Sequence, residues 1–487
     1  MFSDDEEAID NEFVDNLLSR INSGCVGYID VNDIKDSYFF LVDEGRRDDA
    51  VAMLNWALGK QPDNTTLLFT KFTQLVDNEE FEKAQELLEY LRERAHDTST
   101  FQYDQAVLLL RRGEISTAME WFEMSFSNTQ GDEQRYTIMD AVTELTRAQY
   151  FEESQKFYAR LSHDDIFQDL ELAFGYAYAL DKTGRDEEAL RAYEEVVKID
   201  PFCSNAWNNL GIEYGKFERF EESLTAYTNA TDAAPYNANP YFNKGNTYKA
   251  LDKFYEAIEN YTEYVSLVVM SQDDGVAEGF DSSVFLHIGE CWYSLGNYDI
   301  AKRFLRLAVT TFVPQADTGW YNLGRCLTEM GEYSEAREAL GTAIALNREC
   351  ADYYYANAQV FLQQGILPES IEMLEAGLSK SPNDVLAWFE LIRVKLLSME
   401  SGSTYSIKDY IAKMKRRYKT PMALRLVDAY IDYFVYGRKR YAADKIRMVA
   451  GDTPSVINEA MVEPTLSKLF MQQDITPILR EFNIRLR

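Results

Sequence analysis

Apolar and small residues recur along the chain with a period of 34 to 36 positions. With Ser204 as position 1, the unit has large apolar residues at positions 4, 7, 11 and 24, small ones at 8, 20 and 27, and proline at 32; these are Trp207, Leu210, Tyr214, Tyr227, Gly211, Ser223, Ala230 and Pro235. Apolar positions three and four residues apart predict two helices per unit, each with one buried face. Units begin at Val31, Thr65, Ser99, Arg135, Leu170, Ser204, Ala238, Ser282, Asp317, Ala351, Val385 and Ala423, with longer steps of 44 residues after Ala238 and 38 before Ala423.

Small residues and helix breakers keep a fixed register within the unit. Position 20, where two helices are expected to cross closely, is alanine at Ala50, Ala84, Ala118, Ala189, Ala257, Ala301, Ala336 and Ala442. Position 15 is glycine at Gly45, Gly113, Gly184, Gly296, Gly331, Gly365 and Gly437, which suits the left-handed residue that ends a helix. Position 32 is proline at Pro62, Pro201, Pro235 and Pro382, which stops the second helix before the next unit.

These residues resemble the tetratricopeptide repeat, a helix-turn-helix unit of 34 residues. The resemblance is best over residues 170–384 and weaker in the outer units. It implies an all-α, right-handed superhelical solenoid of about eleven or twelve helix pairs. Members of this family bind many unrelated proteins, so the resemblance implies a protein-binding scaffold without naming its partner.

Four regions are expected along the chain. Residues 1–30 form an acidic N-terminus and a capping helix whose apolar face holds Ile9, Phe13, Leu17 and Ile21. Residues 31–169 form divergent repeats, and 170–399 form the best-matching repeats with a surface insertion near 271–283. Residues 400–487 form a degenerate repeat followed by C-terminal capping helices, over 455–487, and are net basic.

The net charge of −32 is unevenly spread. Residues 385–487 carry 18 Lys and Arg against 11 Asp and Glu, a balance of +7, which leaves −39 on residues 1–384. Because residues 1–384 are so negative, nucleic acid and anionic membranes are poor partners, and a basic protein segment is favoured. The runs KMKRRYK (413–419) and GRKRY (437–441) are interpreted as solvated helix faces, with an acidic partner or phosphates as the alternative.

A cytoplasmic location is expected, since the sequence contains neither a secretory signal nor an apolar run long enough to span a membrane. The five cysteines form no CxxC pair, which indicates thiols in a reducing compartment. Three scattered histidines and the absence of HExxH, Walker and GxSxG motifs predict no enzymatic activity, cofactor or metal.

The surface opposite the packed face of each first helix is the candidate binding groove, at positions 2, 6, 9 and 13. Asparagines there resemble the asparagine ladder of some peptide-binding helical repeats, since an amide offers both a donor and an acceptor to a peptide backbone. Asparagine at position 6 is also common in the family without that role, and the row breaks at Gly175, His287 and Ala356. Aromatic residues at position 5 flank the groove. The candidate residues are Asn205, Asn209, Asn239, Phe242, Asn243, Asn246, His287, Tyr321, Asn322, Arg325 and Tyr355.

The function indicated is therefore a non-catalytic scaffold or adaptor that binds a partner segment in its concave groove. Position 2 supplies no lysine, which argues against the carboxylate clamp that cochaperones of this family use. Two alternatives stay open: a self-assembling structural component, and a regulator whose basic C-terminal region binds an acidic partner or nucleic acid. The oligomeric state is not determined by the sequence.

Overall fold

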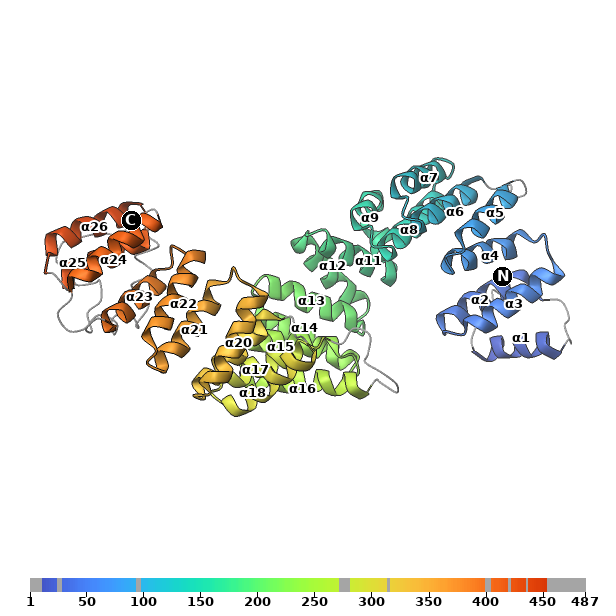
Figure 1. Ribbon diagram of the computed structural model, residues 1–487. Helices are drawn as coiled ribbons and strands as arrows, with labels where there is room; N and C mark the ends of the chain where they lie inside the picture. The colour runs from blue at the N-terminus through green and yellow to red at the C-terminus, as the bar shows by residue number, and fades with distance from the viewer. Residues whose placement is uncertain are drawn as a thin grey trace. The chain divides into compact units, whose positions relative to one another are not determined.

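The computed structural model is composed of helix pairs (Figure 1) and describes residues 11–23, 29–92, 98–270, 281–312, 316–398, 404–418, 422–434 and 437–452. The chain divides into two compact units, residues 1–235 and 236–487, and each is described by itself. No strand occurs among the described residues. The all-α solenoid of helix pairs expected from the sequence is confirmed.

The helix bounds follow the repeat register closely. The first unit contains α1 Asn11–Ser23, α2 Val31–Asp43, α3 Arg47–Lys60, α4 Thr65–Asp77, α5 Phe81–Arg92, α6 Thr98–Arg111, α7 Ile115–Ser127, α8 Asp132–Arg147, α9 Phe151–Tyr158, α10 His163–Phe167, α11 Leu170–Lys182, α12 Asp186–Ile199, α13 Ser204–Lys216 and α14 Phe220–Ala233. The second contains α15 Asn239–Ala250, α16 Phe254–Met270, α17 Val284–Ser294, α18 Tyr298–Leu307, a π-helix Ala308–Phe312, α19 Asp317–Glu329, α20 Tyr333–Leu346, α21 Ala351–Gln363, α22 Leu367–Lys380, α23 Val385–Leu397, α24 Thr404–Arg417, α25 Met422–Phe434 and α26 Lys439–Asp452. The first helix of each pair begins within three residues of the unit start identified in the sequence.

In every pair whose position 15 is among the described residues, that position is left-handed. All seven glycines expected there have φ between +63° and +79°. Four other repeats have a non-glycine residue in the same conformation, namely Glu79, Gln149, Glu218 and Asp252. The left-handed backbone is thus a property of the fold, and glycine is only the residue that adopts it most easily.

Close packing inside each pair explains the small residues at positions 8 and 20. A Cβ atom added to Gly211 would lie 2.5 Å from the Tyr227 ring, and one added to Gly324 would lie 2.5 Å from Leu340, at position 24 of the same unit. The eight position-20 alanines are fully buried. At two of the positions where serine replaces alanine, its hydroxyl donates to the position-8 carbonyl: Ser223 to Gly211 at 2.7 Å and Ser370 to Ala358 at 2.9 Å.

The ends of the array are described in part. Helix α1 lies where the capping helix is expected, and its Val14 and Leu17 are buried in a cluster with residues of α2 and α3. The predicted C-terminal caps, over 455–487, lie outside the described residues. So do residues 1–10 of the N-terminus and residues 271–280, which belong to the predicted insertion. The proposed division at 169/170 and 399/400 stays a prediction.

Candidate functional site

The candidate groove residues all lie on first helices of the pairs. Asn205 and Asn209 lie on α13 of the first unit. The second unit holds the others: Asn239, Phe242, Asn243 and Asn246 on α15, His287 on α17, Tyr321, Asn322 and Arg325 on α19, and Tyr355 on α21.

The position-6 asparagines contact the preceding helix pair. The Asn209 amide donates to the Tyr193 hydroxyl at 3.1 Å, and the Asn322 amide donates to a Glu290 oxygen at 2.8 Å. At position 9, Asn246 accepts from the Tyr261 hydroxyl at 2.7 Å. Tyr193 and Tyr261 are fully buried, so these amides also satisfy hydroxyl groups that would otherwise lack a partner.

A half-buried polar network joins α15, α17 and α19. Lys249 Nζ lies 2.9 Å from His287 Nδ1 and 2.7 Å from Glu290 Oε2. Glu290 Oε2 also lies 3.4 Å from His287 Nδ1, so the three side chains form one cluster. Burial alone raises the pKa of the Glu290 carboxyl, but its contacts with His287 and Lys249 outweigh this and hold the pKa below its ordinary value. The His287 ring also stacks on Tyr261 at 5.7 Å between centroids.

Two hollows open at the same repeat positions, one in each unit. The Gly175 hollow, of about 310 Å³, is lined by Thr143, Thr146, Arg147, Gln149, Tyr158, Glu171, Phe174, Gly175 and Tyr178. The Ala356 hollow, of about 240 Å³, is lined by Tyr293, Tyr321, Arg325, Thr328, Glu329, Asp352, Tyr355, Ala356 and Gln359. Both use positions 9, 12 and 13 of one repeat and positions 2, 5, 6 and 9 of the next.

Each hollow lies where a small residue interrupts the asparagine row. Position 6 is Gly175 in one hollow and Ala356 in the other. An asparagine at this position sends its amide toward the preceding pair, as Asn209 and Asn322 do. Glycine and alanine are too short to reach the preceding pair, although the Tyr158 hydroxyl takes part of the space beside Gly175. These two breaks in the row, unlike the one at His287, therefore coincide with hollows between neighbouring pairs.

The Ala356 hollow contains a stacked arginine. The Arg325 guanidinium lies 4.8 Å from the Tyr293 ring centroid and 5.5 Å from that of Tyr321. Burial raises the pKa of both tyrosines, and the nearby guanidinium opposes the shift. Tyr355, expected to flank the groove, forms a wall: a Cβ atom added to Gly377 would lie 2.3 Å from its ring, and its buried hydroxyl has no partner among the described residues.

The Gly175 hollow is lined by two stacked aromatic rings and a paired charge. The rings of Phe174 and Tyr178 are nearly parallel, with centroids 6.3 Å apart. Arg147 forms ion pairs with Glu144 at 2.8 Å and with Glu171 at 3.2 Å. No position in this hollow carries an unpaired cation comparable to Arg325 among the described residues.

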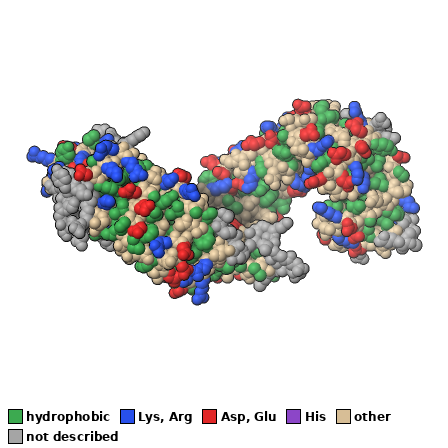
Figure 2. Space-filling model, in the orientation of Figure 1, with side chains coloured by type: hydrophobic (Ala, Val, Ile, Leu, Met, Phe, Trp, Pro, Cys, Tyr) green, Lys and Arg blue, Asp and Glu red, His purple; other side chains and the backbone are tan. Residues whose placement is uncertain are grey.

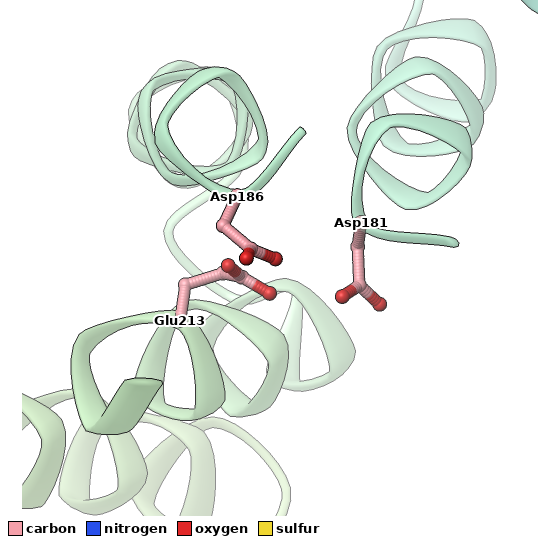
Figure 3. Close-up of side chains that lie close together, drawn as sticks. All are labelled: Asp181, Asp186 and Glu213. Carbon is pink, nitrogen blue, oxygen red and sulfur yellow. The ribbon is translucent and has the colours of Figure 1, made fainter. Parts of the chain in front are cut away.

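A group of three carboxylates in the first unit was not anticipated from the sequence. Figure 3 shows Asp181, Asp186 and Glu213 pointing toward a common centre from α11, α12 and α13. The Lys216 ammonium contacts all three, at 2.6, 2.7 and 2.8 Å respectively, so it takes the place that a cation would occupy. Burial, offset in part by Lys216, raises the pKa of Glu213 to about 7. The sequence indicates this group only through Glu213, an acidic residue at position 10, which precedes Lys216 by three residues.

The charged surface of the last helices matches the predicted basic region in part. Arg438, Lys439, Arg440 and Tyr441 are exposed at the start of α26. Lys and Arg side chains are prominent over the end of the second unit that holds α24–α26 (Figure 2). Lys445 on the same helix is half-buried and pairs with Asp428 at 2.6 Å. Among the described residues, no helix combines the length and apolar character needed to cross a lipid bilayer.

Family models of the tetratricopeptide repeat match residues 69–132, 170–203, 238–267 and 327–385. Pre-mRNA-splicing factor 6 of Saccharomyces cerevisiae is 25% identical over 128 residues, which are 26% of this chain and 14% of that protein. The chain thus spans a small part of that relative's length.

Several solved structures resemble parts of the chain at low sequence identity. A repeat protein named YrrB, described as having an unusual peptide-binding site, is 18% identical over 40% of this chain and 96% of its own, with a TM-score of 0.35. The Cut9–Hcn1 hetero-tetramer of APC/C gives 14% identity, 79% and 92% coverage and a TM-score of 0.37. PilF of Pseudomonas aeruginosa is 16% identical over 47% of this chain and 97% of its own, with a TM-score of 0.35.

Proposed function

The chain is a tetratricopeptide repeat protein, and we propose that it acts as a non-catalytic scaffold that binds an extended segment of a partner protein along its first helices. The observation that supports this most is the recurrence of one hollow, built from the same seven repeat positions, in each compact unit. Concave sites between neighbouring helices are where ligands bind in helical arrays.

The polar residues beside the hollows supply hydrogen bonds to a peptide backbone. Asn322 uses one amide N–H on Glu290, which leaves a second donor and the amide oxygen without a partner among the described residues. Asn209 likewise retains one N–H after its bond to Tyr193 and its contact with Asn208. A backbone bound in this way needs no particular sequence, and the hollows would then select side chains.

The charge of the chain favours a partner that is basic over much of its length. A net charge of −32 steers basic proteins toward the surface and repels acidic ones. The buried free thiols of Cys291 and Cys326, whose pKa burial raises to about 11, fit the reducing interior of a cell.

Site-specific photo-crosslinking in the source cell tests the proposal. A crosslinking residue in place of Gln359, which lines the Ala356 hollow, is expected to capture a partner protein. The matched control is Glu372, which is exposed on the second helix α22 and lines neither hollow. Equal capture at both positions, or capture at Glu372 alone, would contradict binding along the first helices.

A second candidate function uses the basic end of the chain. The exposed run Arg438, Lys439 and Arg440 supports binding of an acidic partner, which includes the acidic body of a second copy. Self-association through opposite charges would weaken with salt, so light scattering at two ionic strengths tests it. A mass that does not change between low and moderate salt, or with protein concentration, removes this candidate.

A further inference from the structure

The Ala356 hollow holds a cation that has no anionic partner within the chain. Arg325 is half-buried between the Tyr293 and Tyr321 rings, and no carboxylate in the part of the chain that the structure describes lies within ion-pair distance of it. A guanidinium stacked on aromatic rings has little rotational freedom left to lose. Arg325 also forms a hydrogen bond with Tyr293, but a guanidinium has five N–H groups, so others can serve a planar acceptor. A charge that is partly removed from water without a partner has more to gain from an anion than an exposed charge has.

We propose that the Ala356 hollow binds a single acidic side chain of the partner segment through Arg325. This rests on the proposed function, in which a partner segment lies along the first helices. The bound carboxylate would accept two N–H groups from the guanidinium, an arrangement that arginine favours and lysine does not support. Position 9 therefore sets the residue preference of this hollow.

The rim of the hollow restricts what lies next to that acidic residue. Glu329 and Asp352 line the hollow, are exposed, and form no ion pair with a cation among the described residues. They repel a second acidic residue and attract a basic one. The occupant is thus an acidic residue flanked by basic or neutral residues, which agrees with the basic character favoured by the chain's net charge.

The Gly175 hollow of the first unit does not share the preference for an acidic side chain that we propose for the Ala356 hollow. Position 9 of the Gly175 hollow is Thr143, and the cation that lines it, Arg147, already has two carboxylate partners. The Gly175 hollow therefore lacks the unpaired cation on which the proposal depends.

The test pans a phage-displayed library of random 12-residue peptides against the full-length protein. Enriched peptides are then synthesised and titrated by fluorescence anisotropy against the wild type, Arg325→Gln and Arg303→Gln. Arg303 is the matched control, because it is exposed on the second helix α18 and no carboxylate among the described residues pairs with it. Thermal melting by circular dichroism verifies that each variant is folded.

The expected result is enrichment of peptides with one Asp or Glu, whose affinity falls about tenfold or more in Arg325→Gln and stays unchanged in Arg303→Gln. Asp352→Asn is expected to raise the affinity for those enriched peptides whose acidic residue is flanked by neutral residues, because it removes repulsion without removing an attraction. Enriched peptides without an acidic residue, or with equal affinity for the wild type and Arg325→Gln, would overturn the inference while leaving the proposed function standing. If the wild type retains no peptide above background, the proposed function fails and the inference fails with it.

Discussion

Replacing Glu218 with glycine is expected to stabilise the α13–α14 pair. Glu218 has φ of +57°, in the turn where seven other pairs carry glycine. The left-handed conformation costs a non-glycine residue about 1–2 kcal/mol. Glycine removes that strain but has more freedom to lose on folding, about 0.4–1 kcal/mol. The Glu218 side chain is exposed and forms no ion pair among the described residues, so its removal costs no contact. The difference is a gain of about 0.5–1 kcal/mol for Glu218→Gly.

The reciprocal substitution tests the same reasoning in the opposite direction. Gly184 has φ of +73°, and a Cβ atom added to it would meet no atom within 4 Å. Gly184→Ala therefore introduces backbone strain without a clash, and we expect it to destabilise the α11–α12 pair by about 0.5–1 kcal/mol.

Native-state hydrogen exchange measures both effects locally, which suits a repeat array whose pairs can open separately. Amides of α13 and α14 should exchange about two to five times more slowly in Glu218→Gly, the factor that corresponds to 0.5–1 kcal/mol. The control is Glu221→Gly, an exposed position in α14, where glycine should accelerate exchange because it is a poor helix former. Faster exchange in Glu218→Gly, or slower exchange in Gly184→Ala, would refute the reasoning.

Three further predictions concern buried contacts within and between the pairs. Because the pKa of Glu213 is raised to about 7 in the folded chain, its contribution to stability is complete below its ordinary value near 4.5 and is lost as pH rises through about 7. Glu213→Gln should thus raise the free energy of unfolding relative to the wild type by about 2 kcal/mol at pH 8 and by little at pH 5. Melting curves of both proteins at the two pH values measure this. A stability difference between variant and wild type that is the same at both pH values would contradict it. Gly324→Ala places a Cβ atom 2.5 Å from Leu340 and should cost about 1–3 kcal/mol by urea unfolding, whereas the exposed Gly341, with nothing within 4 Å, should tolerate alanine. Asn209→Ala removes the partner of the buried Tyr193 hydroxyl and should cost about 1–3 kcal/mol in the same assay, a loss that Tyr193→Phe in the same chain should restore.

The fold could be predicted because the residues that pack the two helices of a pair together lie within one repeat. Position 8 is glycine where Tyr227 or Leu340 presses on the backbone, and position 20 is alanine where the helices cross. These contacts lie inside one unit and have a constant sequence separation, so the period displays them directly. Glu218 and the three similar residues were not foreseen at position 15, because glutamate gives no signal of a left-handed turn.

The site was less accessible to sequence reasoning because its contacts lie between neighbouring helix pairs. The partner of Asn209 is a tyrosine 16 residues earlier, on the second helix of the preceding pair. The Lys216 group joins residues of three helices in two neighbouring pairs. Gly175 and Ala356 looked like interruptions of a pattern, and only the packing of neighbouring helices turns those interruptions into hollows. Whether the remaining candidates bind a partner stays a prediction.

The shared lining of each hollow has a consequence for how such a chain can change over evolution. A hollow takes positions 9, 12 and 13 from one pair and positions 2, 5, 6 and 9 from the next, so neither pair encodes it alone. Loss of the pair α19–α20 would join the α17 repeat to the α21 repeat and bring Glu290 to the place now held by Arg325. The charge at the centre of the hollow would reverse in a single deletion, without any substitution in the helices that remain. Gain or loss of whole repeats can therefore create a new specificity in one genetic step.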